Sequence, residues 1–253
     1  MTNALISTVD WVSAGTTLST NSEVEGLGVA NLATWSPEEV WRSLPGPGRW
    51  VQADFGGPVE VGVVCLVMPR SGVQLGAGDG ITLMLDAATP GAGALLSAPM
   101  INADYGYWWR FLPVAQHPRY LRLNIDSTLP YVQGGRLWVG PARVMTRNFG
   151  FDWSREWADD GRKTRAPKSG RRFRTAGPRY RRLSIAFPRT SPADADAIED
   201  ADRRLGCLGQ MLICTHPDAP QKRVLLGTPE SVTPITQPRV SSFSKTYVIE
   251  EDL

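Results

Sequence analysis

RYLRLNIDSTLPYVQGGRLWVGPA, residues 119–142, contains two segments with the pattern of β-strands. In LRLNI (121–125), apolar and polar residues alternate, which is the two-residue period of a strand with one buried face. A second short strand is predicted at 136–139, directly after a Gly-Gly turn. We expect the two strands to pair and to form the closing edge of a β-sandwich.

Short segments with the pattern of β-strands continue throughout the first part of the chain, where helical periodicity is almost absent. Strand-length segments are separated by Gly- and Pro-rich turns such as PGPG (45–48) and TPGAG (89–93). Six or more strands at this spacing predict a β-sandwich or jelly roll over residues 1–145. The predicted strands are 50–56, 59–69, 80–87, 107–114, 119–125 and 135–145.

The texture changes after residue 145, which predicts a second domain over 146–253. Ser191 is a candidate N-cap, with Pro192 at the first helical position and Gly206 as the stop signal, so one helix is expected between them. A small α+β domain is therefore predicted, with this helix on a mostly antiparallel sheet. The segment 148–161 is expected to be a short helix or irregular, and strands are expected at 179–187, 210–216, 222–228 and 241–251.

Composition and length describe an ordinary globular protein. The chain has 253 residues, of which 42% are hydrophobic and 21% are charged. The longest apolar stretch, 59–68, is too short to cross a bilayer. The N-terminus lacks the pattern of a signal peptide, so stable membrane insertion is not expected.

Charge is distributed unevenly along the chain. Between residues 162 and 182 there are ten Lys or Arg and no Asp or Glu, and this segment is called the basic arm below. Such a block repels itself, so we expect it to be exposed until an acidic surface covers it. Nucleic acid is the alternative partner, but only Phe173 and Tyr180 interleave with the charges and no recognition motif accompanies them. A solvated loop or docking on an acidic neighbour is the preferred interpretation.

Catalytic and metal-binding patterns are weak. The two histidines, His117 and His216, each precede a proline, and no phosphate-binding or dinucleotide-binding loop is found in a strand-to-helix context. We therefore predict a protein without enzymatic activity and without a cofactor. The cysteines are interpreted as packed free thiols, the alternative being a metal site of Cys207, Cys214 and His216.

A binding module is the more serious alternative. YGYWWR (105–110) is the densest aromatic cluster, and its rings could stack on a sugar or fill the core and a subunit interface. Asp54 and Asp126, at strand ends, could serve a structural calcium ion but are more often turn formers. The candidate carbohydrate-binding residues are Tyr105, Tyr107, Trp108 and Trp109.

The order of several motifs resembles the minor tail or tail-tip proteins of long-tailed bacteriophages, which carry an N-terminal jelly roll of the galactose-binding or discoidin type. The matching stretches are Asn31-Leu32, WRS (41–43), DFG (54–56), RYLRLNI (119–125) and GRLWVGP (135–141). The strand, the Ser-Pro-capped helix ending in RRLG and the final acidic strand are similar to the domain that follows in those proteins. The resemblance covers nearly the whole chain.

This resemblance implies a virion structural protein of the tail tip or baseplate, made in the host cytoplasm. It would form a homo-oligomeric ring and contact the tail-tube, tape-measure and hub proteins; the alternative is a receptor-recognising tail protein that binds a host surface glycan. In a ring, unlike surfaces of identical subunits meet, so the basic arm would face the acidic helix or the acidic C-terminus of the next copy. The candidate interface residues are Arg162, Lys163, Arg165, Lys168, Arg171, Arg172, Arg174, Glu250, Glu251 and Asp252.

Overall fold

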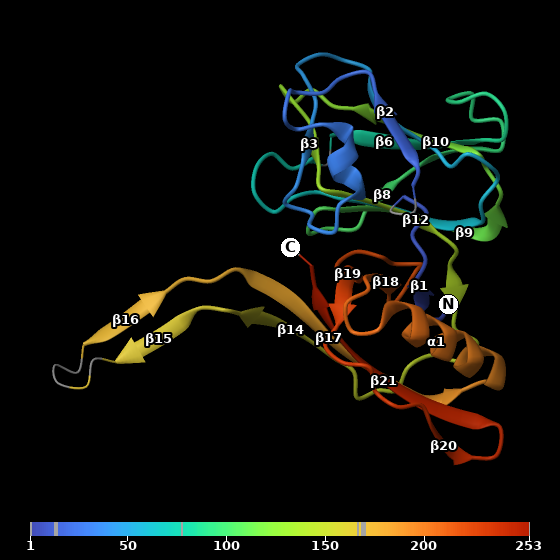
Figure 1. Ribbon diagram of the computed structural model, residues 1–253, viewed down its shortest axis with the longest axis vertical. Helices are drawn as coiled ribbons and strands as arrows, with labels where there is room; N and C mark the ends of the chain where they lie inside the picture. The colour runs from blue at the N-terminus through green and yellow to red at the C-terminus, as the bar shows by residue number, and fades with distance from the viewer. Residues whose placement is uncertain (1, 13–14, 77, 166, 168–170, 253) are drawn as a thin grey trace. The chain divides into compact units, whose positions relative to one another are not determined.

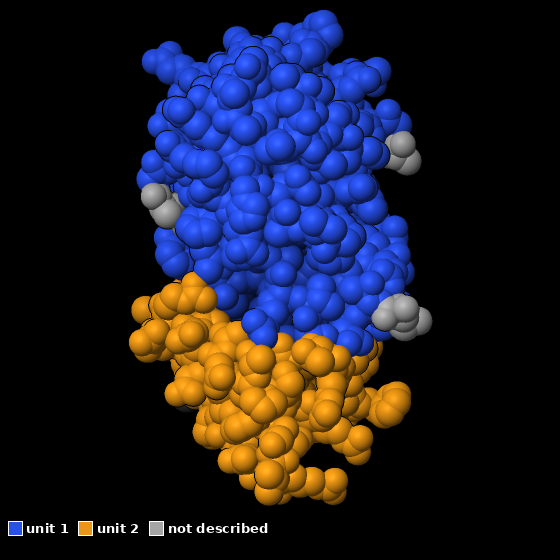
Figure 2. All heavy atoms as spheres, turned by 90° about the vertical axis from the view of Figure 1, so that its right-hand side faces the viewer, with its two compact units in different colours: residues 1–145, 210–224, 253 blue, residues 146–209, 225–252 orange. Residues whose placement is uncertain are grey.

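The computed structural model describes residues 2–12, 15–76, 78–165, 167 and 171–252. They form two compact units, coloured separately in Figure 2. Unit 1 contains residues 1–145 and 210–224, and unit 2 contains residues 146–209 and 225–252. The chain thus changes unit at residue 145, where the sequence texture changes. The return of 210–224 to unit 1 was not part of the expected division into 1–145 and 146–253.

Unit 1 is a sandwich of two antiparallel sheets (Figure 1). One face of the five-stranded sheet and one face of the four-stranded sheet share a core to which Val51, Leu123, Leu66 and Leu137 contribute. The five-stranded sheet has the order β2 (Thr17–Thr20), β4 (Arg49–Asp54), β10 (Tyr120–Asp126), β6 (Gly80–Asp86) and β7 (Leu96–Pro99). The four-stranded sheet has the order β12 (Arg136–Gly140), β5 (Val61–Val67), β9 (Tyr107–Gln116) and β8 (Ile101–Asn102).

Burial along the strands explains their sequence patterns. In β4 and β10, buried and half-exposed residues alternate, because one face of that sheet is covered and the other meets solvent. Strand β5 is buried at every position, as its continuous apolar run predicts. The predicted mainly β class with an N-terminal sandwich is confirmed.

The expected pairing of the two opening strands is wrong. Strand β10 lies in the middle of its sheet between β4 and β6, whereas β12 is an edge strand of the other sheet and pairs with β5. Both strands send apolar side chains into the same core from opposite sides. A two-residue period identifies the face that a strand buries but not its partner, and this explains the error.

Smaller elements complete unit 1. A 3-10 helix, η1 (Val29–Ala33), precedes β3 (Trp41–Arg42), which pairs with β11 (Gln133–Gly134). Strand β1 pairs with both β13 and β18. The buried ion pair between Arg136 and Asp10 ties the N-terminal segment to β12. The bounds of the three-stranded group are β13 (Arg143–Val144), β1 (Leu5–Ser7) and β18 (Met211–Cys214).

Unit 2 is an antiparallel sheet that carries one α-helix among its described residues. The strand order is β19, β21, β17 and β14. Strand β20 also pairs with β21, on the side away from β17. The segment 148–161, expected to be helical or irregular, contributes β14 instead. The bounds are β14 (Ser154–Asp159), β15 (Arg162–Arg165), β16 (Arg172–Thr175), β17 (Arg179–Thr190), α1 (Pro192–Leu205), β19 (Val224–Pro229), β20 (Thr236–Arg239) and β21 (Ser242–Glu251).

Helix α1 begins and ends where its local signals predict. The Ser191 side chain accepts a hydrogen bond from the Asp194 backbone N–H at 3.2 Å, and Gly206 forms the C-cap. The helix lies on β21, because the Asp202 carboxylate accepts hydrogen bonds from two residues of that strand. Lys245 Nζ donates at 2.5 Å and the Tyr247 hydroxyl at 3.1 Å. No helix within the described residues is long and apolar enough to span a membrane.

Candidate functional site

The basic arm begins as an exposed two-stranded hairpin. Strand β15 pairs with β16, and every residue of both strands is exposed. Within unit 2, Figure 1 shows this hairpin extending beyond β14 and β17, away from α1. A two-stranded hairpin without a packed face is at best marginally stable in water. We therefore expect the β15–β16 hairpin to be firmly ordered only when another surface covers it.

The register of this hairpin places cations directly opposite one another. Lys163 faces Arg174, and Arg165 faces Arg172. Like charges at opposed strand positions destabilise the pair, and no Asp or Glu occurs between residues 161 and 178 to offset them. An acidic partner would convert this repulsion into attraction. The candidate interface residues Arg162, Lys163, Arg165, Arg171, Arg172 and Arg174 are all exposed, and Lys168 lies outside the described residues.

Large aromatic rings accompany the charges. Phe173, on β16, is 59% exposed, and Trp157, on the edge strand β14, is 53% exposed. Aromatic residues and arginine are the residue types enriched in protein interfaces. The β15–β16 hairpin thus combines an exposed apolar ring with charges of one sign, whereas β14 adds a second exposed ring but also carries the exposed carboxylates of Glu156 and Asp159.

The acidic C-terminus, which was expected to face a neighbouring copy, makes contacts within its own unit. Glu251 is buried and forms an ion pair with Arg181, each side chain being 2% exposed. The Thr228 hydroxyl donates to Asp252 at 3.0 Å, and Glu250 lies 3.6 Å from Arg182. The ion pair between Arg181 and Glu251 was not predicted from the sequence, because the two residues are far apart along the chain and Arg181 belongs to the basic arm, which was expected to face outward.

Helix α1 carries an exposed acidic face. Asp196, Glu199 and Asp200 are exposed, and Asp200 accepts a hydrogen bond from Arg203 at 2.9 Å. Asp196 and Glu199 are three residues apart, so both point to the same side of the helix. With Glu251 buried and the acidic residue on either side of it only half-exposed, this face is the most exposed part of the predicted acidic surface.

The aromatic cluster 105–110 is mostly interior. Tyr107, Trp108 and Trp109 are 1%, 4% and 1% exposed, and Trp108 belongs to the sandwich core. These three rings lack the exposed face that stacking on a sugar requires. Tyr105, at 41% exposed, is the member of the predicted carbohydrate-binding set that meets solvent.

A strained turn presents Tyr105. Asp104, Tyr105 and Gly106 have φ values of 64°, 52° and 84°, which is the left-handed region that bulky residues rarely adopt. The turn is held from both sides, because the Asp104 N–H donates to the Asn102 side chain at 2.9 Å and the Tyr107 N–H donates to the Asp104 carbonyl at 3.0 Å. Strain of this kind is often found at binding sites.

The two aspartates considered as calcium ligands, Asp54 and Asp126, lie in different environments. Asp54 accepts two hydrogen bonds from Arg119, at 3.0 and 3.1 Å, and one from the Gly56 N–H at 2.9 Å. The Arg119 guanidinium holds the pKa of Asp54 below its usual value. Asp54 is therefore a turn former engaged in an ion pair, while Asp126 is exposed at the end of β10.

The cysteines differ in their accessibility. Cys65 and Cys214 are buried, and Cys207 is exposed. Burial raises the pKa of the Cys214 thiol to about 12. Among the described residues, no three His, Cys, Asp or Glu side chains come together in a group that could hold a metal ion, so the structure does not assemble Cys207, Cys214 and His216 into such a site.

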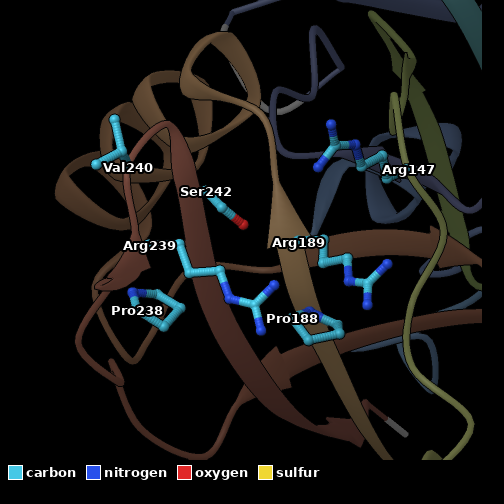
Figure 3. A pocket seen from close by; sticks show the side chains of 7 residues that line it. All are labelled: Arg147, Pro188, Arg189, Pro238, Arg239, Val240 and Ser242. Atoms are coloured by element: carbon cyan, nitrogen blue, oxygen red, sulfur yellow. The ribbon is translucent and has the colours of Figure 1, made fainter.

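A pocket that was not predicted from the sequence lies in unit 2 (Figure 3). It has a volume of about 440 Å³. The sequence signal that could have revealed it is a repeated Pro-Arg dipeptide at 188–189 and 238–239. Its lining residues are Arg147, Pro188, Arg189, Pro238, Arg239, Val240 and Ser242.

Comparison with solved structures finds lectin domains and carbohydrate-binding modules that are similar to part of this chain at low sequence identity. The lectin domain of lectinolysin complexed with Lewis B antigen shares 16% identity at a TM-score of 0.41, over 53% of this chain and 97% of that one. The family 32 module of Clostridium perfringens NanJ in complex with galactose shares 9% identity at a TM-score of 0.43, over 55% and 99%.

A fucose-binding module of Streptococcus pneumoniae also shares 9% identity at a TM-score of 0.43, over 52% of this chain and 94% of that one. No protein-family model and no curated protein matches the chain. These likenesses concern the fold of about half of the chain.

Proposed function

We propose that the protein is a structural subunit that assembles with copies of itself, the β15–β16 hairpin of each copy docking on its neighbour. The observation that carries this proposal is the hairpin, which exposes all of its described strand residues and opposes cation to cation. Such an element gains stability from a partner and gains little from its own chain.

The acidic face of α1 in a second copy is the proposed docking surface. Asp196 and Glu199 are exposed there, and each copy offers one such face and one basic hairpin. A contact between unlike surfaces of identical subunits generates a ring when the rotation closes. Phe173 would supply an apolar anchor at this contact, since salt screens exposed ion pairs strongly.

The proposed setting is the tail tip or baseplate of a long-tailed bacteriophage. Support comes from the ordered sequence motifs that resemble minor tail proteins, including WRS (41–43), DFG (54–56) and GRLWVGP (135–141). In that setting the partners are the tail-tube, tape-measure and hub proteins, and the location is the virion. The role is structural and does not require a cofactor or catalysis.

Charge exchange tests the docking directly. Arg172→Glu with Arg174→Glu should dissociate the oligomer, and adding Asp196→Lys with Glu199→Lys should restore it, because the charges of both surfaces are then inverted. The matched control is Arg189→Glu with Arg239→Glu, which makes the same charge change elsewhere in unit 2. Sedimentation velocity measures the species present. An oligomer that survives the arm reversal, or that the control dissociates equally, would refute hairpin docking.

Glycan recognition by unit 1 is the second candidate function. The observation in its favour is the strained turn that displays the half-exposed ring of Tyr105. On a glycan array that includes galactose and fucose ligands, the full chain should bind a ligand that Tyr105→Ala loses. Tyr180→Ala, in unit 2, is the control. Absence of binding by the unaltered chain would remove this candidate without affecting the assembly proposal.

A further inference from the structure

We propose that Arg147, Arg189 and Arg239 form a binding site for a phosphate or sulfate group carried on a small, sugar-sized molecule. The three side chains line one pocket of unit 2, shown as sticks in Figure 3. This site does not depend on the proposed assembly, because it contains none of the residues of the β15–β16 hairpin.

The topology of the sheet brings two of these arginines together. Strand β21 lies between β17 and β20, with Thr190 opposite Phe243 on one side and Arg239 opposite Ser242 on the other. Arg189 and Arg239 therefore flank neighbouring positions of β21, with strands spaced by about 4.8 Å. Arg147 reaches the same pocket from the segment that precedes β14.

Both flanking arginines lie at irregularities of the strand pairing. The register of β17 against β21 shifts between Phe187 and Thr190, and that of β20 against β21 shifts between Thr236 and Arg239. Each irregularity contains a Pro-Arg dipeptide, and proline suits a bulge because it lacks the N–H that a regular ladder needs. Bulges redirect side chains and are frequent beside binding sites.

The charge of the pocket is uncompensated within the described part of the chain. Its lining contains three arginines and no carboxylate. Among the described residues, none forms an ion pair with Arg147, Arg189 or Arg239. An oxyanion would relieve the mutual repulsion, and the guanidinium fork matches phosphate and sulfate oxygens in paired hydrogen bonds.

Size and lining narrow the ligand further. The volume of about 440 Å³ falls in the range of sites for small organic molecules and exceeds what one inorganic phosphate fills. Pro188, Pro238 and Val240 provide an apolar wall, and Ser242 adds a hydroxyl group. The pocket thus fits an anionic group attached to a larger neutral body.

Calorimetric titration of the full chain at low salt tests the site, with glucose 6-phosphate, glucose 6-sulfate and neutral glucose as probes. One or both anionic probes should bind and glucose should not. Arg189→Gln with Arg239→Gln should weaken binding at least about tenfold, because two charge-assisted contacts are lost. Binding of the phosphate alone or of the sulfate alone identifies which ester the site prefers.

Arg70→Gln with Lys222→Gln is the matched control, since it removes the same charge from two exposed positions of unit 1 that belong neither to the pocket nor to the β15–β16 hairpin. It should leave the affinity within about twofold, as expected for surface cations that do not line the site. Equal loss in both double variants would show non-specific attraction and overturn the proposal, as would the absence of binding by the unaltered chain. If the pocket double variant melts early, Arg239→Gln alone, an exposed position on β20, replaces it.

Discussion

Replacing Glu251 with alanine should destabilise unit 2 rather than weaken assembly directly. Glu251 accepts hydrogen bonds from Arg181 Nε at 2.9 Å and from the Arg181 backbone N–H at 3.0 Å, and both side chains are 2% exposed. Removing one partner of such a pair costs about 3–5 kcal/mol, because the remaining charge stays buried without compensation.

This cost translates into a large change in melting temperature. A unit of about ninety residues loses roughly 4–8 °C per kcal/mol, so the midpoint of unit 2 should fall by at least about 12 °C. Arg181→Met combined with Glu251→Leu should recover most of the loss, since apolar side chains of similar volume replace a buried ion pair at little cost.

Differential scanning calorimetry measures the midpoints, and mass photometry well below them measures the oligomer. The Glu251→Ala chain, kept folded by low temperature, should have the same oligomeric state as the unaltered chain. A variant that melts within about 3 °C of the unaltered chain, less than 1 kcal/mol for a unit of this size, and yet loses the oligomer would refute the reasoning. Glu251 would then be an interface residue, as the sequence analysis expected.

Three other predictions concern individual contacts. Ser191→Ala should lower the free energy of unfolding by about 0.5–2 kcal/mol through loss of the N-cap, and an unchanged urea midpoint would contradict it. Arg119 lowers the pKa of Asp54, so this carboxylate stabilises the fold above its unfolded pKa and stops doing so as pH falls through its folded pKa. The stability difference between the unaltered chain and Asp54→Asn should therefore shrink below about pH 4, whereas a difference that is constant down to roughly pH 2.5 would exclude this role. A thiol reagent at about pH 8 should label exposed Cys207 and spare Cys214, because burial raises the pKa of the Cys214 thiol to about 12. Mass spectrometry locates the label, and rapid labelling of Cys214 would contradict its burial.

Local signals predicted the elements whose causes are local. Ser191 and Gly206 marked the ends of α1, because capping depends on residues within one turn of the helix. The alternation in 121–125 predicted which residues of β10 are buried, because the period of a strand fixes its faces.

Features that depend on distant partners escaped sequence reasoning. The partners of β10 are β4 and β6, and its own sequence does not encode that choice. Likewise, the burial of Glu251 depends on Arg181, seventy residues away along the chain. The three-arginine pocket was missed because Arg147, Arg189 and Arg239 come from separate segments that only the sheet brings together.

The aromatic cluster illustrates a different limit. Its density indicated either a ligand site or a core, and composition cannot distinguish these because both favour tryptophan and tyrosine. The structure buries Tyr107, Trp108 and Trp109 and leaves Tyr105 at the strained turn. Whether each ring packs in the core or can contact a ligand is therefore decided by its exposure, which the sequence does not give.

The oligomeric state of the purified full chain tests the assembly claim most directly. Mass photometry should show a single closed oligomer that becomes monomeric when Arg172 and Arg174 are changed to glutamate, with unit 2 still folded by calorimetry. A chain that remains monomeric at every concentration tested, or an oligomer indifferent to those two changes, would contradict the account.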